Sequence, residues 1–226
     1  MKNYLKYFLT IAMVGMLSVI AKAADDDNLI SITLFDQFED GYVILKSKAR
    51  VSAKLNFDKI AEKILFLDGE TMYELEANTV SIVVIKERFF VPVGDKYYYE
   101  RIAVGEKEFF IRHRAKVVSK GKPAGYGTYS QSSAITGISS ITSSGQLYAL
   151  GTGEKFEGKD ESSILLIKGK KYERIGSLKV LISHFKSHQS ALEAYAKENK
   201  TNFAKMEDVK AIVEYAFSLF LKKRDF

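Results

Sequence analysis

Between residues 62 and 118, short runs of apolar and polar positions alternate and are separated by turn-forming pairs. The clearest pair is Asp68-Gly69, which suits a two-residue hairpin because both central positions of such a turn need a positive φ. Gly94-Asp95 and Gly105-Glu106 mark two further turns, and each is followed by an aromatic-rich run. Aromatic residues fit a half-buried, pleated surface, so the pattern predicts an antiparallel β meander.

From residue 177 onwards the apolar period changes to that of amphipathic helices. The first apolar stripe, with a break expected near Ser187, comprises Leu178, Leu181, Ile182, Phe185, Leu192, Tyr195 and Ala196. A second helix runs from about 205 to 221, and its stripe includes Val209, Ile212, Val213 and Phe217. The predicted fold class is therefore α+β: an antiparallel meander of about eight to ten short strands, then two or three amphipathic C-terminal helices packed on it.

The first 23 residues have the three parts of a secretory signal peptide. A basic start is followed by an apolar run of 14 residues and by Ala21-Lys22-Ala23, the small-x-small pattern that precedes cleavage. The alternative is an uncleaved anchor, but a membrane-spanning helix needs about 20 apolar residues. We therefore expect cleavage after Ala23 and no transmembrane span in the mature chain. The rest divides into a β-rich domain over 24–176 and a helical segment over 177–226.

Residues 121–145 form a polar insertion rich in Gly, Ser and Thr. A segment of this composition buries too little apolar surface to offset an ordering entropy of about 1–2 kcal/mol per residue, so we predict a mobile loop. A few of its larger side chains are candidates for partner binding: Tyr126, Tyr129, Ile135, Ile138 and Ile141.

Composition narrows the functional classes. The chain contains no cysteine, which excludes disulfides, thiolate metal sites and a cysteine nucleophile. Cysteine-free exported proteins are more typical of a bacterial envelope than of an animal extracellular space. The formal charge is +6, and without the three lysines of the signal segment it falls to +3. A charge this small gives no reason to expect nucleic-acid binding.

The layout of the chain resembles a group of uncharacterised exported proteins of Bacteroidetes-type bacteria. The resemblance is carried by the export signal, the Gly-Asp and Gly-Glu turns, the polar insertion, and the helices around Glu207-Asp208-Val209 and Glu214-Tyr215. It implies an envelope location, and it implies no activity and no functional residues.

A basic stripe on one predicted strand is a candidate anion site. Arg112, Arg114 and Lys116 alternate along the strand and so project the same way, and guanidinium groups suit a lipid phosphate or an acidic glycan. The plainer interpretation is a solvated strand face. Tyr97 and Tyr99 belong to an aromatic cluster that is suited either to stacking on sugars or to pairing across strands within the sheet.

The sequence contains no specific catalytic, cofactor or metal motif, so we expect no cofactor and no metal. His184 and His188 lie four residues apart on a predicted helix, but a zinc site needs three or four protein ligands. Residues 153–159 have the spacing of a phosphate loop, but Asp160 stands where Ser or Thr would bind magnesium. His113 is expected to be buried, hydrogen-bonded and neutral.

These observations favour an exported, non-enzymatic interaction or structural protein of the cell envelope, located in the periplasm, at the outer membrane or outside the cell. Its partner is then an envelope protein or a glycan. The alternative is a binding module for a glycan or a lipid head group, which uses the aromatic residues and the basic stripe. A third interpretation is a hydrolase with an unrecognised pair of carboxylates, such as Glu100 and Glu108.

Overall fold

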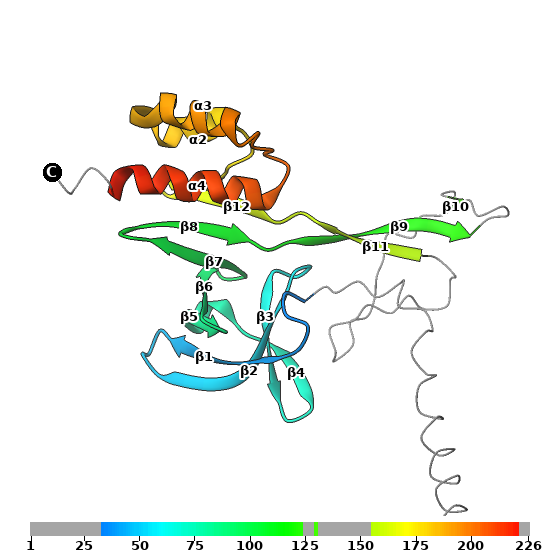
Figure 1. The fold of residues 1–226 in the computed structure, drawn as a ribbon. Helices are drawn as coiled ribbons and strands as arrows, with labels where there is room; N and C mark the ends of the chain where they lie inside the picture. The colour runs from blue at the N-terminus through cyan, green and yellow to red at the C-terminus, as the bar shows by residue number, and fades with distance from the viewer. Residues whose placement is uncertain (1–32, 124–128, 131–154, 222–226) are drawn as a thin grey trace, which may run out of the picture.

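The structure is a computed structural model that describes residues 33–123, 129–130 and 155–221 (Figure 1). The predicted signal peptide lies outside these residues, as does the predicted insertion apart from residues 121–123 and 129–130. Within the described part, a ten-stranded sheet and a three-stranded sheet are followed by C-terminal helices. This architecture confirms the predicted α+β class.

The ten-stranded sheet has the order β13-β12-β8-β7-β6-β5-β1-β2-β3-β4, and all neighbouring strands are antiparallel. In chain order its strands are β1 (Glu39–Leu45), β2 (Arg50–Asp58), β3 (Lys63–Asp68), β4 (Thr71–Glu74), β5 (Val80–Ile85), β6 (Arg88–Val93), β7 (Tyr97–Val104), β8 (Lys107–Arg112), β12 (Ser163–Lys168) and β13 (Lys171–Arg174). A 3-10 helix, η1 (Ala77–Thr79), connects β4 to β5. After η1 the chain does not continue beside β4. Instead β5 returns to pair with β1, which leaves β4 at the edge of the sheet.

Glycine forms the first position of three two-residue turns in this sheet. Gly69, Gly105 and Gly169 have φ values of +61°, +60° and +64°. Glycine adopts positive φ without steric cost, so these turns follow directly from the sequence. The expectation that Asp68 shares the positive φ is wrong, because Asp68 is the last residue of β3 and Gly69-Glu70 forms the turn.

The turn between β5 and β6 contains no glycine. Lys86 and Glu87 both have positive φ, +46° and +65°, as a type I′ turn requires. The left-handed conformation costs an L-residue about 1–2 kcal/mol. The strands on either side contribute Ile85 and Phe90, both completely buried, so the packing of the hairpin offsets the strain of its turn.

Strands β7-β6-β5-β1-β2-β3 curl into a partly closed barrel. The curl closes where the backbone N–H of Tyr98, on β7, donates to the carbonyl oxygen of Glu62, just before β3, at 3.1 Å. Gly41 on β1 allows the curl to be tight, since a Cβ there would lie 2.4 Å from the carbonyl oxygen of Val84. The core inside the curl includes Val43, Leu55, Phe57, Ile64, Val83, Ile85, Phe90 and Tyr98.

After β8 the chain leaves the ten-stranded sheet and enters an arm that extends away from the body (Figure 1). The arm is a three-stranded sheet of β9 (Ala115–Pro123), β10 (Tyr129–Ser130) and β11 (Lys155–Asp160), in the order β10-β9-β11. The sequence predicted one strand from 107 to 118, whereas the structure divides this run between two sheets at His113-Arg114.

The arm bears on two further interpretations of the sequence, of which one changes and one agrees with the structure. The predicted insertion begins too early, because β9 continues through residues 121–123. The segment with phosphate-loop spacing contributes to β11, where Gly158 and Lys159 pair with β9 instead of opening a helix. This pairing agrees with the interpretation, drawn from Asp160 at the magnesium-binding position, that residues 153–159 match the phosphate-loop spacing by chance.

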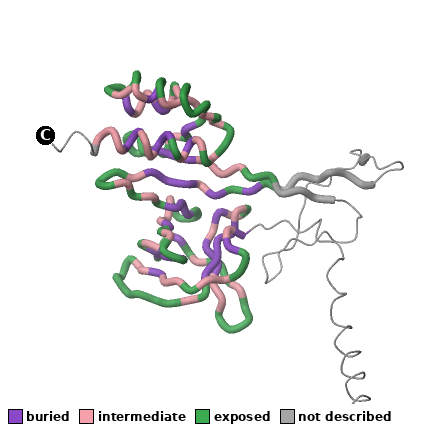
Figure 2. Tube along the Cα trace, viewed as in Figure 1, coloured by how far each residue is buried: buried purple, intermediate pink, exposed green. Residues whose placement is uncertain are grey.

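The C-terminal helices are α2 (Leu178–His184), a 3-10 turn η3 (Lys186–His188), α3 (Gln189–Glu198) and α4 (Met206–Leu221). The predicted break near Ser187 is confirmed by η3. The helices lie on one side of β8 and β12 (Figure 1), and the middle of β8 beneath them is buried (Figure 2). Their shared core includes Phe109, Ile111, Ile164, Leu166, Leu181, Phe185, Leu192, Val209, Ile212, Val213 and Phe217.

Candidate functional site

The side of β8 and β12 opposite the helices carries a set of aromatic and apolar side chains that no described helix covers. We call this set the tyrosine face. Its members are Phe89, Val91, Val93, Tyr97, Tyr99, Phe110, Leu165, Ile167 and Tyr172. They come from five strands of the ten-stranded sheet, β6, β7, β8, β12 and β13.

The strand register places these residues on one surface, because directly opposite residues of an antiparallel pair share a face. Phe89 pairs with Arg101, Arg101 pairs with Phe110, and Phe110 pairs with Leu165. Parallel to this row, Val91 pairs with Tyr99. The tyrosine face therefore runs continuously across the sheet from β6 to β12.

Much of the apolar surface that the described chain exposes lies on this face. Seven large hydrophobic side chains are notably exposed, and four of them are Phe89 (45%), Tyr97 (42%), Ile167 (46%) and Tyr172 (36%). Isolated exposed hydrophobic residues are ordinary, but their concentration on one side of one sheet makes this face a candidate contact surface.

Tyr172 connects the exposed residues to a buried floor. Its ring stands nearly perpendicular to those of Tyr99 and Phe110, with centroid distances of 5.2 and 5.0 Å. Edge-to-face pairs of this kind are favourable, and they fix the orientation of the rings. Burial, as the largest effect, raises the pKa of the hydroxyl groups of Tyr99 and Tyr172, so both remain neutral hydrogen-bond donors at neutral pH.

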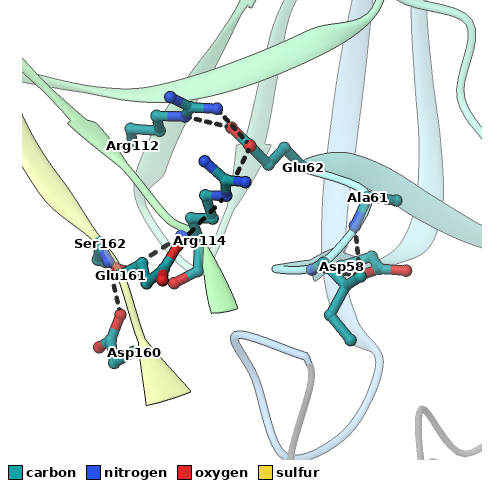
Figure 3. Close-up of polar contacts among 9 residues, drawn as sticks. Asp58, Ala61, Glu62, Arg112, Arg114, Asp160, Glu161 and Ser162 are labelled. Atoms are coloured by element: carbon teal, nitrogen blue, oxygen red, sulfur yellow. Dashed lines mark hydrogen bonds and ion pairs between the residues drawn. The ribbon is translucent and has the colours of Figure 1, made fainter. Parts of the chain in front are cut away.

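A cluster of charged residues lies at the end of β8 (Figure 3), and its members Arg112 and Glu62 are close enough to Tyr99 to influence the ionisation of its hydroxyl group. Nε and Nη2 of Arg112 each lie 2.6 Å from a carboxylate oxygen of Glu62, which makes a bidentate pair. Nε of Arg114 lies 3.7 Å from Glu62 and 3.8 Å from Glu161. The hydrogen bonds to Glu62 raise the pKa of Arg112 above its usual value. Two carboxylates thus balance two guanidinium groups.

The turn before β3 aims Glu62 at Arg112. Oδ1 of Asp58 accepts hydrogen bonds from the backbone N–H groups of Ile60 at 2.7 Å and Ala61 at 3.0 Å. The next residue, Glu62, is held at a φ of +59°, and its side chain is buried. A non-glycine residue in this conformation is strained by about 1–3 kcal/mol. The bidentate pair with Arg112 offsets this strain.

A second ion pair lies on the tyrosine face itself. Nε of Arg101 donates to a carboxylate oxygen of Glu108 at 2.6 Å, and both side chains are more than a third exposed. The arginines on and beside the face are therefore paired with carboxylates, with the exception of Arg174 at its edge, which has no ion pair among the described residues. The surface is polar at its border and close to neutral in charge.

The structure brings together three of the five ligand-binding residues that the sequence suggests. Tyr97, Tyr99 and Arg112 lie on the same side of the sheet. Arg114 lies two residues after Arg112, between the end of β8 and the start of β9. Lys116 lies on the arm, opposite Lys159 of β11. The stripe is not a set of free cations, because Arg112 and Arg114 face carboxylates.

Sequence reasoning grouped Phe110 with Tyr97 and Tyr99 in one aromatic cluster, but it missed Tyr172 and Glu62 as neighbours of these residues. Their positions depend on pairing between strands far apart in the chain, and no local signal indicates it. Of the proposed partner-binding loop residues, Tyr129 lies in β10, where it pairs with Pro123. The others, Tyr126, Ile135, Ile138 and Ile141, lie outside the described residues.

A second charged network is buried inside the curl. Arg88 binds Glu100 through Nε and Nη2, each at 2.6 Å, and Nε2 of His113 lies 2.6 Å from Glu100. Burial raises the pKa of Glu100, but the hydrogen bonds and charges of Arg88 and His113 outweigh it and lower the pKa to about 2. The predicted burial and hydrogen bonding of His113 are confirmed. This network has its charges satisfied and stabilises the interior of the curl.

The other candidate constellations do not converge. Glu100 faces the interior, whereas Glu108 faces the opposite side of the sheet, so they do not flank a common substrate. Nε2 of His184 lies 2.7 Å from Glu173, whereas the ring of His188 packs on Phe220. Among the described residues there is no group of three histidine, aspartate or glutamate side chains placed to hold a metal.

A cleft among the described residues lies elsewhere, at the start of α4. Its volume is about 290 Å³, and its lining includes Ser162, Arg174 and Lys205 together with Asp160 and Glu207. The mixture of charges and the exposure of Asp160 and Lys205 make it an ordinary surface depression.

No protein-family model, curated protein or solved structure matches this chain. In the part of the chain that the structure describes, no helix has the length and apolar character needed to cross a membrane.

Proposed function

We propose that this is an exported, non-enzymatic binding protein of the cell envelope and that the tyrosine face is its contact surface. The observation that carries the proposal is the concentration of exposed aromatic residues on the one side of β8 and β12 that the described helices leave open. Exposed apolar patches cost solubility, so their grouping favours a role in binding.

Export and envelope location rest on the sequence. Residues 1–23 have the charge, apolar length and small residues of a cleavable signal, and the layout resembles exported proteins of Bacteroidetes-type bacteria. A binding role is supported over a hydrolytic one because the carboxylates near the face are all engaged. Glu62 holds Arg112 and Arg114, and Glu108 holds Arg101.

Two measurements test this function. The N-terminus of the protein recovered from the envelope fraction should begin at Ala24, and a product that keeps Met1 would contradict export by cleavage.

Purified mature protein should also bind isolated envelopes of the producing cell in a sedimentation assay. The double variant Tyr97→Ser/Tyr172→Ser should lose most of this binding, because both rings are exposed on the face.

Tyr73→Ser is the matched control for the binding assay. Tyr73 is as exposed as Tyr97, at 47%, and its ring stacks on Phe66, but it lies on β4 at the other edge of the sheet. If binding is unaffected in the double variant, or falls equally in the control, then the tyrosine face is not the contact surface.

A further inference from the structure

Building on the function proposed above, we propose that the tyrosine face binds an uncharged polysaccharide chain. Tyr97 and Tyr172 supply the exposed stacking surface, and Tyr99 lies buried beneath Tyr172. The Arg112–Glu62 pair at the border and the Arg101–Glu108 pair on the face supply hydrogen bonds. The proposal rests on the chemistry of the face, its charge balance and its place in the sheet.

The rings match one side of a sugar. A pyranose ring presents a flat patch of C–H groups and an edge of hydroxyl groups, so it requires an apolar surface with polar groups at its border. Tyrosine combines a large apolar ring with one hydroxyl group that remains wet. Tyr99 and Phe110 are buried and held in place by Tyr172, so the floor of the surface is fixed before a ligand arrives.

The ion pairs favour a ligand without charge. Arg112 uses Nε and Nη2 on Glu62, which leaves Nη1 and one N–H of Nη2 to donate, and a carboxylate oxygen retains lone pairs that accept. Such a pair can donate to one sugar hydroxyl and accept from the next. An anion would have to compete with Glu62 for Arg112 and with Glu108 for Arg101.

The same features disfavour other ligands. An anionic membrane attracts clusters of unpaired cations, whereas Arg101, Arg112 and Arg114 are paired with carboxylates and Arg174 alone of the four, at the edge of the face, has no ion pair among the described residues. A peptide that adds a strand needs a free strand edge. Among the five strands of the face only β13 has one in the described sheet, so an added strand would extend the sheet beside β13 and would not cover the rings, since β6, β7, β8 and β12 each have a partner on both sides. An uncharged chain that lies flat across the rings requires neither.

The test is binding of the purified mature protein to a panel of insoluble polysaccharides. The uncharged probes are cellulose, chitin, starch and mannan, and the charged probe is polygalacturonate. Vesicles of phosphatidylglycerol and phosphatidylethanolamine serve as the membrane probe. We expect retention on at least one uncharged polysaccharide that survives 0.5 M NaCl, because contacts between neutral groups are not screened by salt.

Variants connect retention to the face. Tyr97→Ser and Tyr172→Ser should each weaken binding about tenfold, the effect of losing one stacked ring. Tyr172→Phe keeps the ring and should bind within about threefold of wild type, and Tyr73→Ser should bind as wild type. Melting curves of all four variants check that each is folded.

The other outcomes overturn the proposal in distinguishable ways. Retention only on polygalacturonate or only on the vesicles means that a charged ligand is bound. Retention on no uncharged probe, while Tyr97→Ser/Tyr172→Ser still abolishes envelope binding, leaves the binding function standing and removes the glycan as its ligand. Envelope binding that the double variant does not change removes both.

Discussion

The two sides of β8 and β12 are both hydrophobic, but they differ in the residues they use. The helix-covered side presents Phe109, Ile111, Ile164 and Leu166, all buried beneath α4 and its neighbours. The tyrosine face presents Tyr99, Phe110 and Leu165 as a floor, with Tyr172 partly exposed above them. One side is aliphatic and phenylalanine-rich, and the other includes hydroxyl groups.

This difference in side chains predicts that the helix-covered side mainly stabilises the fold and that the tyrosine face mainly serves binding. Side chains without polar atoms are suited to a surface that never meets water, whereas tyrosine is suited to one that is wet until a ligand covers it. The helix-covered side should therefore contribute more to the free energy of unfolding than the tyrosine face does. The tyrosine face should tolerate substitution and lose binding instead. Four predictions test this division.

Phe217→Ala should have the largest effect. The ring is 5% exposed and packs against Phe109 at 6.1 Å and Phe185 at 5.4 Å, so its removal leaves a cavity between α4 and β8. We expect a loss of about 3–5 kcal/mol in the free energy of unfolding, measured by urea denaturation. Phe89→Ala removes the same ring from the tyrosine face, where it is 45% exposed, and should cost less than about 1 kcal/mol. Equal losses in the two variants would contradict the division.

Acid should destabilise the folded protein through Glu100, which is buried inside the curl. Its pKa is lowered from 4.5 to about 2 in the folded state, so the unfolded state binds the proton more readily. The stabilising contribution is complete above pH 4.5 and is lost as the pH falls through 2. The shift corresponds to about 3 kcal/mol.

The measurement is the free energy of unfolding from pH 7 to pH 2 in wild type and in Glu100→Gln. Other carboxylates titrate in both proteins, so only the difference between the two curves reports on Glu100. The variant should be less stable at pH 7, and its curve should approach that of wild type near pH 2. Curves that remain parallel over this range would show that the network of Arg88, Glu100 and His113 does not hold the charge as described.

Gly41→Ala should have an intermediate effect. An alanine Cβ would lie 2.4 Å from the carbonyl oxygen of Val84 and 2.8 Å from Leu55, so β1 and β5 must move apart. Overpacking of this kind costs about 1–3 kcal/mol, measured by thermal melting. Gly176→Ala is the control, because a Cβ there meets nothing within 4 Å. If both variants melt as wild type does, the curl is less tightly packed than the structure describes.

Local features of this fold were predictable from the sequence. Gly69, Gly105 and Gly169 mark turns that need positive φ, and the helical period after residue 177 marks the helices. The Lys86-Glu87 turn was not predictable, because neither residue favours positive φ and the packing of β5 on β6 imposes it. Strand β11 was not predicted either. Its sequence has no apolar alternation, and its pairing with β9 determines its conformation.

The candidate site was predictable only in part. Tyr97 and Tyr99 share a face because they alternate on one strand, which is a local rule. Tyr172 reaches Tyr99 through the pairing of β8 with β12, and Glu62 reaches Arg112 across 50 residues of chain. The same long-range contact explains why the basic stripe looks free in the sequence, although Glu62 and Glu161 balance two of its members in the structure.

The smallest effect on stability should come from Tyr97→Ser, and its neighbour provides the sharpest contrast. Tyr97 and Tyr98 are adjacent on β7 but face opposite sides of the sheet. Tyr97 is 42% exposed on the tyrosine face, whereas Tyr98 is fully buried inside the curl, with its hydroxyl 3.4 Å from the carbonyl oxygen of Leu75. Tyr97→Ser should change the free energy of unfolding by no more than about 0.5 kcal/mol, a shift of about 1–2 °C in melting temperature. Tyr98→Ser should cost about 3–5 kcal/mol, as for other large aromatic residues removed from a core. Similar melting temperatures for the two variants would mean that β7 is not held in this register, and the tyrosine face would then lose one of its five strands.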